Sequence, residues 1–241
     1  MSDSGQQTPL VFVHGSGDSA RSWAQVIDAL PDIPCVALDL PGHGALIEQP
    51  GPDSPSVSDY AAFVRAEIER RGLMGARVVG HSLGGAIALQ LTLDAPEMIT
   101  GVALVGTGAR LRVLPELLAA AQEDPAALHE LAGFGFAPGH EDARERFLRE
   151  LEPLAPGALY RDLAACDAFD CRAELERITC PALIVVGTED RLTPPKYAAF
   201  LRDSLPHTTL VEIAGAGHYL SYEAPELLAA TLRDWQTQTL S

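Results

Sequence analysis

Positive charge is scarce in this chain of 241 residues. It contains 17 lysine and arginine residues against 33 aspartate and glutamate residues, and its formal net charge is −16. Lys196 is its single lysine. A surface this acidic repels phosphate backbones and anionic lipid headgroups. The sequence therefore predicts neither a nucleic-acid partner nor a membrane partner.

Cysteine pairs and long apolar runs are also missing. Cys35, Cys166, Cys171 and Cys180 have no C-x-x-C spacing, and no histidines lie beside them at zinc-ligand spacing. We expect four reduced structural thiols, no metal and no cofactor. The apolar stretches are far shorter than a membrane span, and the polar segment 1–8 has no signal-peptide core. These features predict a cytoplasmic protein.

Short apolar runs that alternate with helical patterns dominate what is there. Runs typical of buried strands lie at 10–13, 35–40, 77–80, 101–106, 182–187 and 209–213. Helical patterns lie at 22–30, 58–71, 82–93, 195–205 and 225–237. Strands that alternate with helices indicate an α/β fold with a mostly parallel sheet.

One long segment, 107–170, interrupts this alternation. It has helical stretches at 115–122 and 142–151, and a glycine-rich aromatic stretch that holds Phe134 and Phe136. Ligands bind at the carboxyl ends of strands in such sheets, and this segment starts at one such end. We predict a helical lid at 107–170 over a core of 1–106 and 171–241, although an ordinary pair of surface helices would have the same pattern. The aromatic stretch is expected to be a mobile loop that contacts substrate.

A serine follows one of the predicted strands. Gly80, Ser82 and Gly84 fit the pattern G-x-S-x-G, with a strand before the serine and a helix after it. This context favours a sharp turn that exposes the serine side chain, with the helix N-terminus supplying free N–H groups. We interpret Ser82 as a candidate nucleophile.

A glycine-rich turn follows the first predicted strand, in the order His14, Gly15, Ser16 and Gly17. Backbone N–H groups in this turn could bind an oxyanion together with the N–H of Leu83. A plain glycine turn explains the pattern equally well.

An acid and a histidine follow the last two predicted strands. Asp190 is the better candidate for the acid, with Glu189 as the alternative, and His218 lies between glycine-rich residues beyond the final strand. The order Ser82, Asp190, His218 is the order of serine, acid and base in α/β-hydrolases. Tyr219 is a candidate substrate contact beside Phe134 and Phe136, and His43 is the other histidine expected near the site.

With these residues in place, the chain resembles the α/β-hydrolase superfamily, in particular its small lid-bearing carboxylesterases. The resemblance is carried by the blocks LVFVHGSG, DLPGHG, GHSLGGAIA, VVGTEDRLTP and AGAGHYL. It implies a catalytic triad of Ser82, Asp190 and His218 and an oxyanion hole at Ser16 and Leu83. The family usually has eight strands, and the first two of them would precede the first block, where this sequence has only about eight residues. The resemblance therefore implies a sheet of about six strands with helices on both faces.

The predicted activity is that of a serine hydrolase. We expect a carboxylesterase that cleaves a small, largely apolar ester through an acyl-enzyme intermediate. An acyl thioesterase uses the same chemistry, and a non-catalytic protein that binds a small ligand on the same fold is the alternative of a different class. The sequence does not specify an oligomeric state.

Overall fold

Six parallel strands form one sheet in the order β2-β1-β3-β4-β5-β6. This computed structural model describes residues 8–123 and 133–237. The strands are β1 Leu10–Val13, β2 Cys35–Leu38, β3 Ala76–His81, β4 Ile99–Val105, β5 Ala182–Gly187 and β6 Thr208–Ile213. The predicted fold class and number of strands are confirmed, and only β2 ends two residues early.

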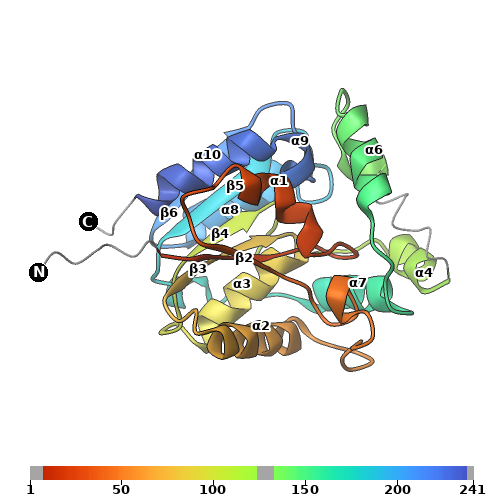
Figure 1. Cartoon of the computed structure of the whole chain (residues 1–241), viewed down its shortest axis with the longest axis horizontal. Helices are drawn as coiled ribbons and strands as arrows, with labels where there is room; N and C mark the ends of the chain where they lie inside the picture. The colour runs from red at the N-terminus through yellow and green to blue at the C-terminus, as the bar shows by residue number, and fades with distance from the viewer. Residues whose placement is uncertain (1–7, 124–132, 238–241) are drawn as a thin grey trace, which may run out of the picture.

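Both faces of the sheet are covered, which explains why the strands are continuously apolar. In β5, Ile184 and Val186 pack into the cluster that contains α2, α3 and α8, whereas Leu183 and Val185 pack with α1 and α10. Figure 1 shows the helices on either side of the sheet. The bounds are α1 Ala24–Asp28, α2 Val57–Arg71, α3 Leu83–Asp94, α8 Pro195–Ser204, α9 Leu220–Glu223 and α10 Pro225–Gln236. Single 3₁₀ turns are η1 Ala20–Trp23, η2 Gly44–Leu46 and η3 Leu175–Arg177.

Helix α2 begins earlier than its sequence pattern indicates. The predicted start at residue 58 is wrong, because Ser56 and Asp59 form a capping box that starts the helix at Val57. The predicted end is confirmed, since Gly72 follows the helix with a left-handed φ of 68°.

The segment between β4 and β5 contains helices and no strand in its described part. Helices α4 (Pro115–Glu123), α6 (Glu141–Glu150) and α7 (Ala158–Ala168) lie at the end of the molecule opposite the two chain termini (Figure 1). Two of them match the predicted helices, and α7 was not foreseen. That the segment acts as a lid stays a prediction.

The aromatic stretch of this segment differs from the expected mobile loop. Residues 133–135 are helical. Phe136 is 4% exposed and stacks on Tyr219, with ring centroids 4.6 Å apart, whereas Phe134 is 48% exposed. The two phenylalanines therefore have different environments, because one side of the short turn faces the apolar cluster around Phe147 and the other does not.

The four cysteines are free thiols, as predicted. Among the described residues, no helix is long and apolar enough to cross a membrane.

Candidate active site

Ser82 lies at the junction between β3 and α3 in a strained backbone conformation. Its φ of 52° and ψ of −113° make it the one non-glycine residue with positive φ in the described part of the chain. Such a conformation costs about 1–3 kcal/mol and persists only where the surroundings enforce it. The backbone turn that exposes the Ser82 side chain is therefore built in by its neighbours.

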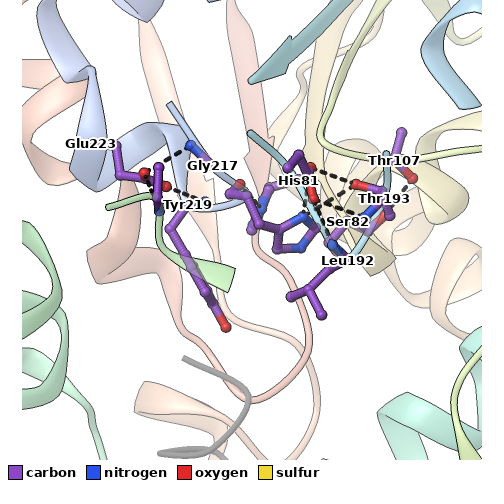
Figure 2. A network of polar contacts seen from close by, with 11 residues as sticks. His81, Ser82, Thr107, Leu192, Thr193, Gly217, Tyr219 and Glu223 are labelled. Atoms are coloured by element: carbon purple, nitrogen blue, oxygen red, sulfur yellow. Dashed lines mark hydrogen bonds and ion pairs between the residues drawn. The ribbon is translucent and has the colours of Figure 1, made fainter. Parts of the chain in front are cut away.

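The flanking glycines permit this turn because the chain passes very close to itself. A Cβ on Gly80 would lie 2.1 Å from the carbonyl oxygen of Gly84, and a Cβ on Gly84 would lie 2.2 Å from the carbonyl oxygen of Val13. Any side chain at either position would clash with backbone. Thr107 stabilises the turn from the next strand end, since its hydroxyl donates to the Ser82 carbonyl at 2.7 Å (Figure 2).

His218 and Asp190 form a buried hydrogen-bonded pair. His218 Nδ1 lies 2.9 Å from Asp190 Oδ2, and the exposed fractions of the two residues are 3% each. The other carboxylate oxygen accepts the backbone N–H groups of Leu192 and Thr193 at 2.9 and 2.8 Å. Because the carboxylate accepts from Nδ1, Nδ1 carries the proton and Nε2 is left free to act as a base.

The pKa of Asp190 identifies the carboxyl that is charged beside His218. Burial by itself would raise this pKa, but the charge of His218 and the hydrogen bonds from His218 and Thr193 hold it below its ordinary value. The alternative acid, Glu189, is exposed and has no hydrogen bond to His218 within the described residues. The geometry favours Asp190 over Glu189.

His81 supports His218 from behind. Its Nε2 donates to the carbonyl oxygen of His218 at 3.0 Å, and the two rings lie 4.7 Å apart. Burial, followed by the nearby His218, lowers the pKa of His81 to about 3, so it is neutral. His81 thus fixes the loop that carries His218, a role that its place inside the G-x-S-x-G pattern did not reveal.

Two backbone N–H groups near the serine have no hydrogen-bond partner in the described part of the chain. Ser16 and Leu83 have no backbone hydrogen-bond acceptor among the described residues. Leu83 is the first residue of α3, and a Cβ on Gly15 would lie 3.3 Å from the Ser82 Cβ, so the loop before Ser16 runs directly along the serine. Free donors on both sides of a reacting centre are suited to binding an oxyanion.

A cavity of about 550 Å³ opens at these residues. Ser16, Ser82, Phe134, His218 and Tyr219 line it, together with a larger set of aliphatic side chains and a few charged ones. The aliphatic residues are Leu111, Val113, Leu114, Leu117, Ala120, Leu163 and Leu192, and the charged ones are Asp18, Arg112, Glu116, Arg191 and Lys196. Phe136 lies outside the lining, so the structure does not bring this candidate to the cavity. The lining is suited to a small, mostly apolar ligand.

The serine and the histidine share this cavity without a direct bond. Within the described part of the chain, no hydrogen bond joins the Ser82 hydroxyl to His218. Catalytic hydrogen bonds of this kind are often long in unliganded enzymes and tighten when substrate binds. The arrangement therefore has a candidate nucleophile and base in one cavity, with the orienting acid buried behind the base.

Cys166 also lines the cavity, and its thiol is a second candidate nucleophile. Burial raises the pKa of its thiol to about 12, so the reactive thiolate is not formed at neutral pH. No group of three or more histidine, cysteine or acidic residues suited to a metal ion occurs among residues 8–123 and 133–237.

Glu223 is a functional candidate that sequence reasoning missed. Its carboxylate accepts the N–H groups of Gly217 and Tyr219, the neighbours of His218, at 2.8 and 2.9 Å. It also accepts the N–H of Ala137, from the segment between β4 and β5, at 3.0 Å. Figure 2 shows this network beside the site. One carboxylate thus ties the loop of His218 to that segment.

Asp18 gives a pH-dependent prediction for stability. Burial raises its pKa to about 7, well above the ordinary value of 3.8. A carboxyl with a raised folded pKa stabilises the fold below the unfolded pKa, and this contribution is lost as the pH rises to about 7. We expect Asp18→Asn to raise Tm more at pH 8 than at pH 4, by several degrees, since a domain of this size shifts by about 2–4 °C per kcal/mol. Calorimetry at both pH values measures this, and equal shifts would contradict it.

Comparisons with known proteins agree with this site. A model described as the alpha/beta hydrolase family matches residues 10–231. A pimeloyl-acyl-carrier-protein methyl ester esterase of Chromobacterium violaceum is 33% identical over 91% of this chain and 91% of its own length. A putative non-heme bromoperoxidase of Mycobacterium tuberculosis is 30% identical over 93% and 92% of the two chains. The solved structure of a thermophilic esterase is 34% identical, with a TM-score of 0.78 over 96% of this chain and 90% of that chain.

The match to the family model covers most of the chain, and esterases occur among both the sequence relatives and the solved structures. The chain belongs to the alpha/beta hydrolase family, as a carboxylic ester hydrolase.

Proposed function

We propose that this protein is a serine carboxylesterase that cleaves small, largely apolar esters through an acyl-enzyme intermediate at Ser82. The observation that carries the proposal is the strained backbone of Ser82 in the same cavity as His218, whose Nδ1 is hydrogen-bonded to Asp190. Strain at one serine has a use when that serine must stand clear of the backbone to attack a substrate.

The reaction proceeds in two halves. His218 Nε2 takes the proton of the Ser82 hydroxyl as its oxygen attacks the ester carbonyl carbon, and Asp190 stabilises the resulting imidazolium. The N–H groups of Ser16 and Leu83 bind the oxyanion of the tetrahedral intermediate. The intermediate collapses, and His218 returns the proton to the departing alcohol. Water, deprotonated by His218, then attacks the acyl carbon. The bond from the acyl carbon to the Ser82 oxygen breaks as His218 passes the proton back to that oxygen, and the acid is released.

The apolar lining of the cavity supports an apolar substrate. The segment that contributes part of this lining is a candidate lid. Leu117 comes from α4 and Leu163 from α7, so the segment 107–170 supplies part of the wall. We propose that this segment is a lid over the core formed by 1–106 and 171–241. Thioesters also have a reacting carbonyl carbon. The Chromobacterium relative is a methyl ester esterase, which places short alcohol groups among the candidates.

The test is covalent labelling together with a panel of substrates. We expect a fluorophosphonate probe to label the wild-type protein at Ser82, with mass spectrometry identifying the modified residue, and Ser82→Ala to remain unlabelled. p-Nitrophenyl esters of increasing chain length, measured beside acyl-CoA thioesters, then define the substrate class. A binding protein without catalysis would give neither labelling nor turnover, and a preference for thioesters would replace the esterase assignment.

The two phenylalanines predict different consequences of substitution. Phe134 lines the cavity and is half exposed, so Phe134→Ala should change the chain-length profile with little change in Tm. Phe136 is buried against Tyr219 and Phe147, so Phe136→Ala should cost about 3–5 kcal/mol of stability. Ester profiles and thermal melts of both variants measure this. An unchanged profile for Phe134→Ala would remove it from the substrate contacts.

A further inference from the structure

A buried carboxylate on α7 takes no part in the proposed chemistry but has three polar partners. Asp162 is fully buried and accepts hydrogen bonds from His43 Nε2 at 2.9 Å, the Tyr60 hydroxyl at 2.7 Å and the Gly17 N–H at 2.9 Å. Each partner comes from a different part of the core. Four segments of the chain, one of them between β4 and β5, therefore meet at this single side chain.

The contacts of His43 indicate an ion pair with Asp162, because both ring nitrogens face acceptors: Nδ1 donates to the Pro41 carbonyl at 3.1 Å and Nε2 to Asp162. Burial by itself would lower the pKa of His43, but Asp162 raises it above its ordinary value. Burial would likewise raise the pKa of Asp162, and the charge and hydrogen bond of His43 hold it below its ordinary value. A buried ion pair is costly to desolvate and is weak evidence for a purely stabilising role. The presence of this ion pair in the interior therefore needs an explanation other than stability.

The third partner, Gly17, points to that explanation. Gly17 directly follows Ser16, whose free N–H is the proposed oxyanion donor, and its φ is 70°. On the other side of Ser16, the Gly15 carbonyl accepts from His14 Nδ1 at 2.8 Å. His14 Nε2 in turn accepts the Leu40 N–H at 3.0 Å. The loop is thus fixed on both sides of Ser16, while the Ser16 N–H stays free.

Two glycines beside Ser16 make this loop pliable unless it is restrained, because glycine has the widest range of backbone conformations. A charged acceptor gives a stronger and shorter hydrogen bond than a neutral one. The bond from Gly17 N–H to Asp162 is of this kind, and the same oxygen, Oδ2, also accepts from His43 Nε2. An oxyanion donor is effective only when its direction is set before the reaction.

We propose that Asp162 is a positioning residue that fixes the oxyanion donor of Ser16 through the Gly17 N–H, with His43 holding the Asp162 carboxylate in its charged form. This inference rests on the proposed function. It also ties α7 to the core through the hydrogen bonds of Asp162.

The bonds at Asp162 separate its two oxygens and so supply a matched control. Gly17 and His43 both bond to Oδ2, whereas Tyr60 bonds to Oδ1. Asp162→Ala removes the acceptor of the Gly17 N–H. Asp162→Asn retains a neutral acceptor at that place, and Tyr60→Phe removes a hydrogen bond of the same carboxylate without touching Gly17.

The experiment measures ester kinetics and the inhibition constant of a trifluoromethyl ketone, which forms an oxyanion when Ser82 adds to it. For Asp162→Ala we expect kcat to fall about 10²-fold with KM nearly unchanged, as for the loss of one oxyanion donor. The inhibition constant should rise by a similar factor. Asp162→Asn should recover part of the loss, and Tyr60→Phe should stay within about twofold of wild type.

Folding is checked by thermal melts of every variant. If Asp162→Ala does not fold, Asp162→Asn alone decides: it should lower kcat and ketone affinity in parallel, by about tenfold. Wild-type kcat and ketone affinity in a folded Asp162 variant would overturn the proposal. Equal losses in Tyr60→Phe and Asp162→Asn would do so too, because they would indicate a structural role only. Failure of the proposed function is recognised separately, since wild type would then turn over no ester.

Discussion

Removal of Ser82 and of His218 should cost nearly the same rate, and removal of both should cost hardly more. We expect Ser82→Ala and His218→Ala each to lower kcat on the order of 10⁴–10⁶-fold. The reason is that the proton of the Ser82 hydroxyl must pass to His218 Nε2, so neither group is useful without the other. Steady-state hydrolysis of a p-nitrophenyl ester by the two single variants and the double variant measures this.

The control for these variants is the fold itself. Ser82→Ala should have a Tm close to that of the wild type, because the backbone turn is imposed by Gly80 and Gly84 and not by the hydroxyl. Additive losses in the double variant would mean that the serine and the histidine act independently. Wild-type turnover in both single variants would remove the catalytic interpretation.

The second large effect concerns the acid beside His218. Asp190→Asn should lower kcat about 10⁴-fold, because an amide nitrogen facing Nδ1 favours the wrong imidazole tautomer. Glu189→Gln is the matched control, since it makes the same chemical change one residue away on an exposed side chain. We expect its kcat to equal that of the wild type. Ester kinetics for the two variants, with thermal melts, provide the comparison.

If Glu189→Gln lost activity and Asp190→Asn kept it, the acid that orients His218 would be Glu189 and not Asp190. The loss of folding stability at low pH offers a second measurement. The pKa of Asp190 is lowered in the fold, so its contribution is present above the unfolded pKa and is lost as the pH falls through the folded value. Wild type should therefore lose more stability than Asp190→Asn when the pH is lowered below about 4.

Local patterns determined the sheet and the turn at Ser82. The four inner strands β1, β3, β4 and β5 are almost fully buried, so their apolar runs were visible without knowledge of their neighbours. The turn could be predicted because it needs glycine at positions 80 and 84. A Cβ at either position would lie about 2 Å from backbone atoms. The order of serine, acid and histidine followed from the order of the strands.

Contacts between distant segments were not visible in this way. His43 stood out as a histidine near the site, but its partner Asp162 lies 119 residues further on, in a helix that no pattern singled out. Glu223 was missed because its partners are backbone N–H groups, which every sequence offers. Phe134 and Phe136 looked equivalent in the sequence, and only the packing around Tyr219 separates them.

The sequence by itself thus determined the fold class, the turn at Ser82 and the set of candidate site residues, because apolar periodicity and glycine sterics act over a few residues. The tertiary structure alone decided which acid faces His218, which phenylalanine reaches the cavity and which carboxylates hold the loops of Ser16 and His218. Those choices depend on distances between segments that the chain brings together only when it folds, and burial then gives each buried carboxylate its charge state.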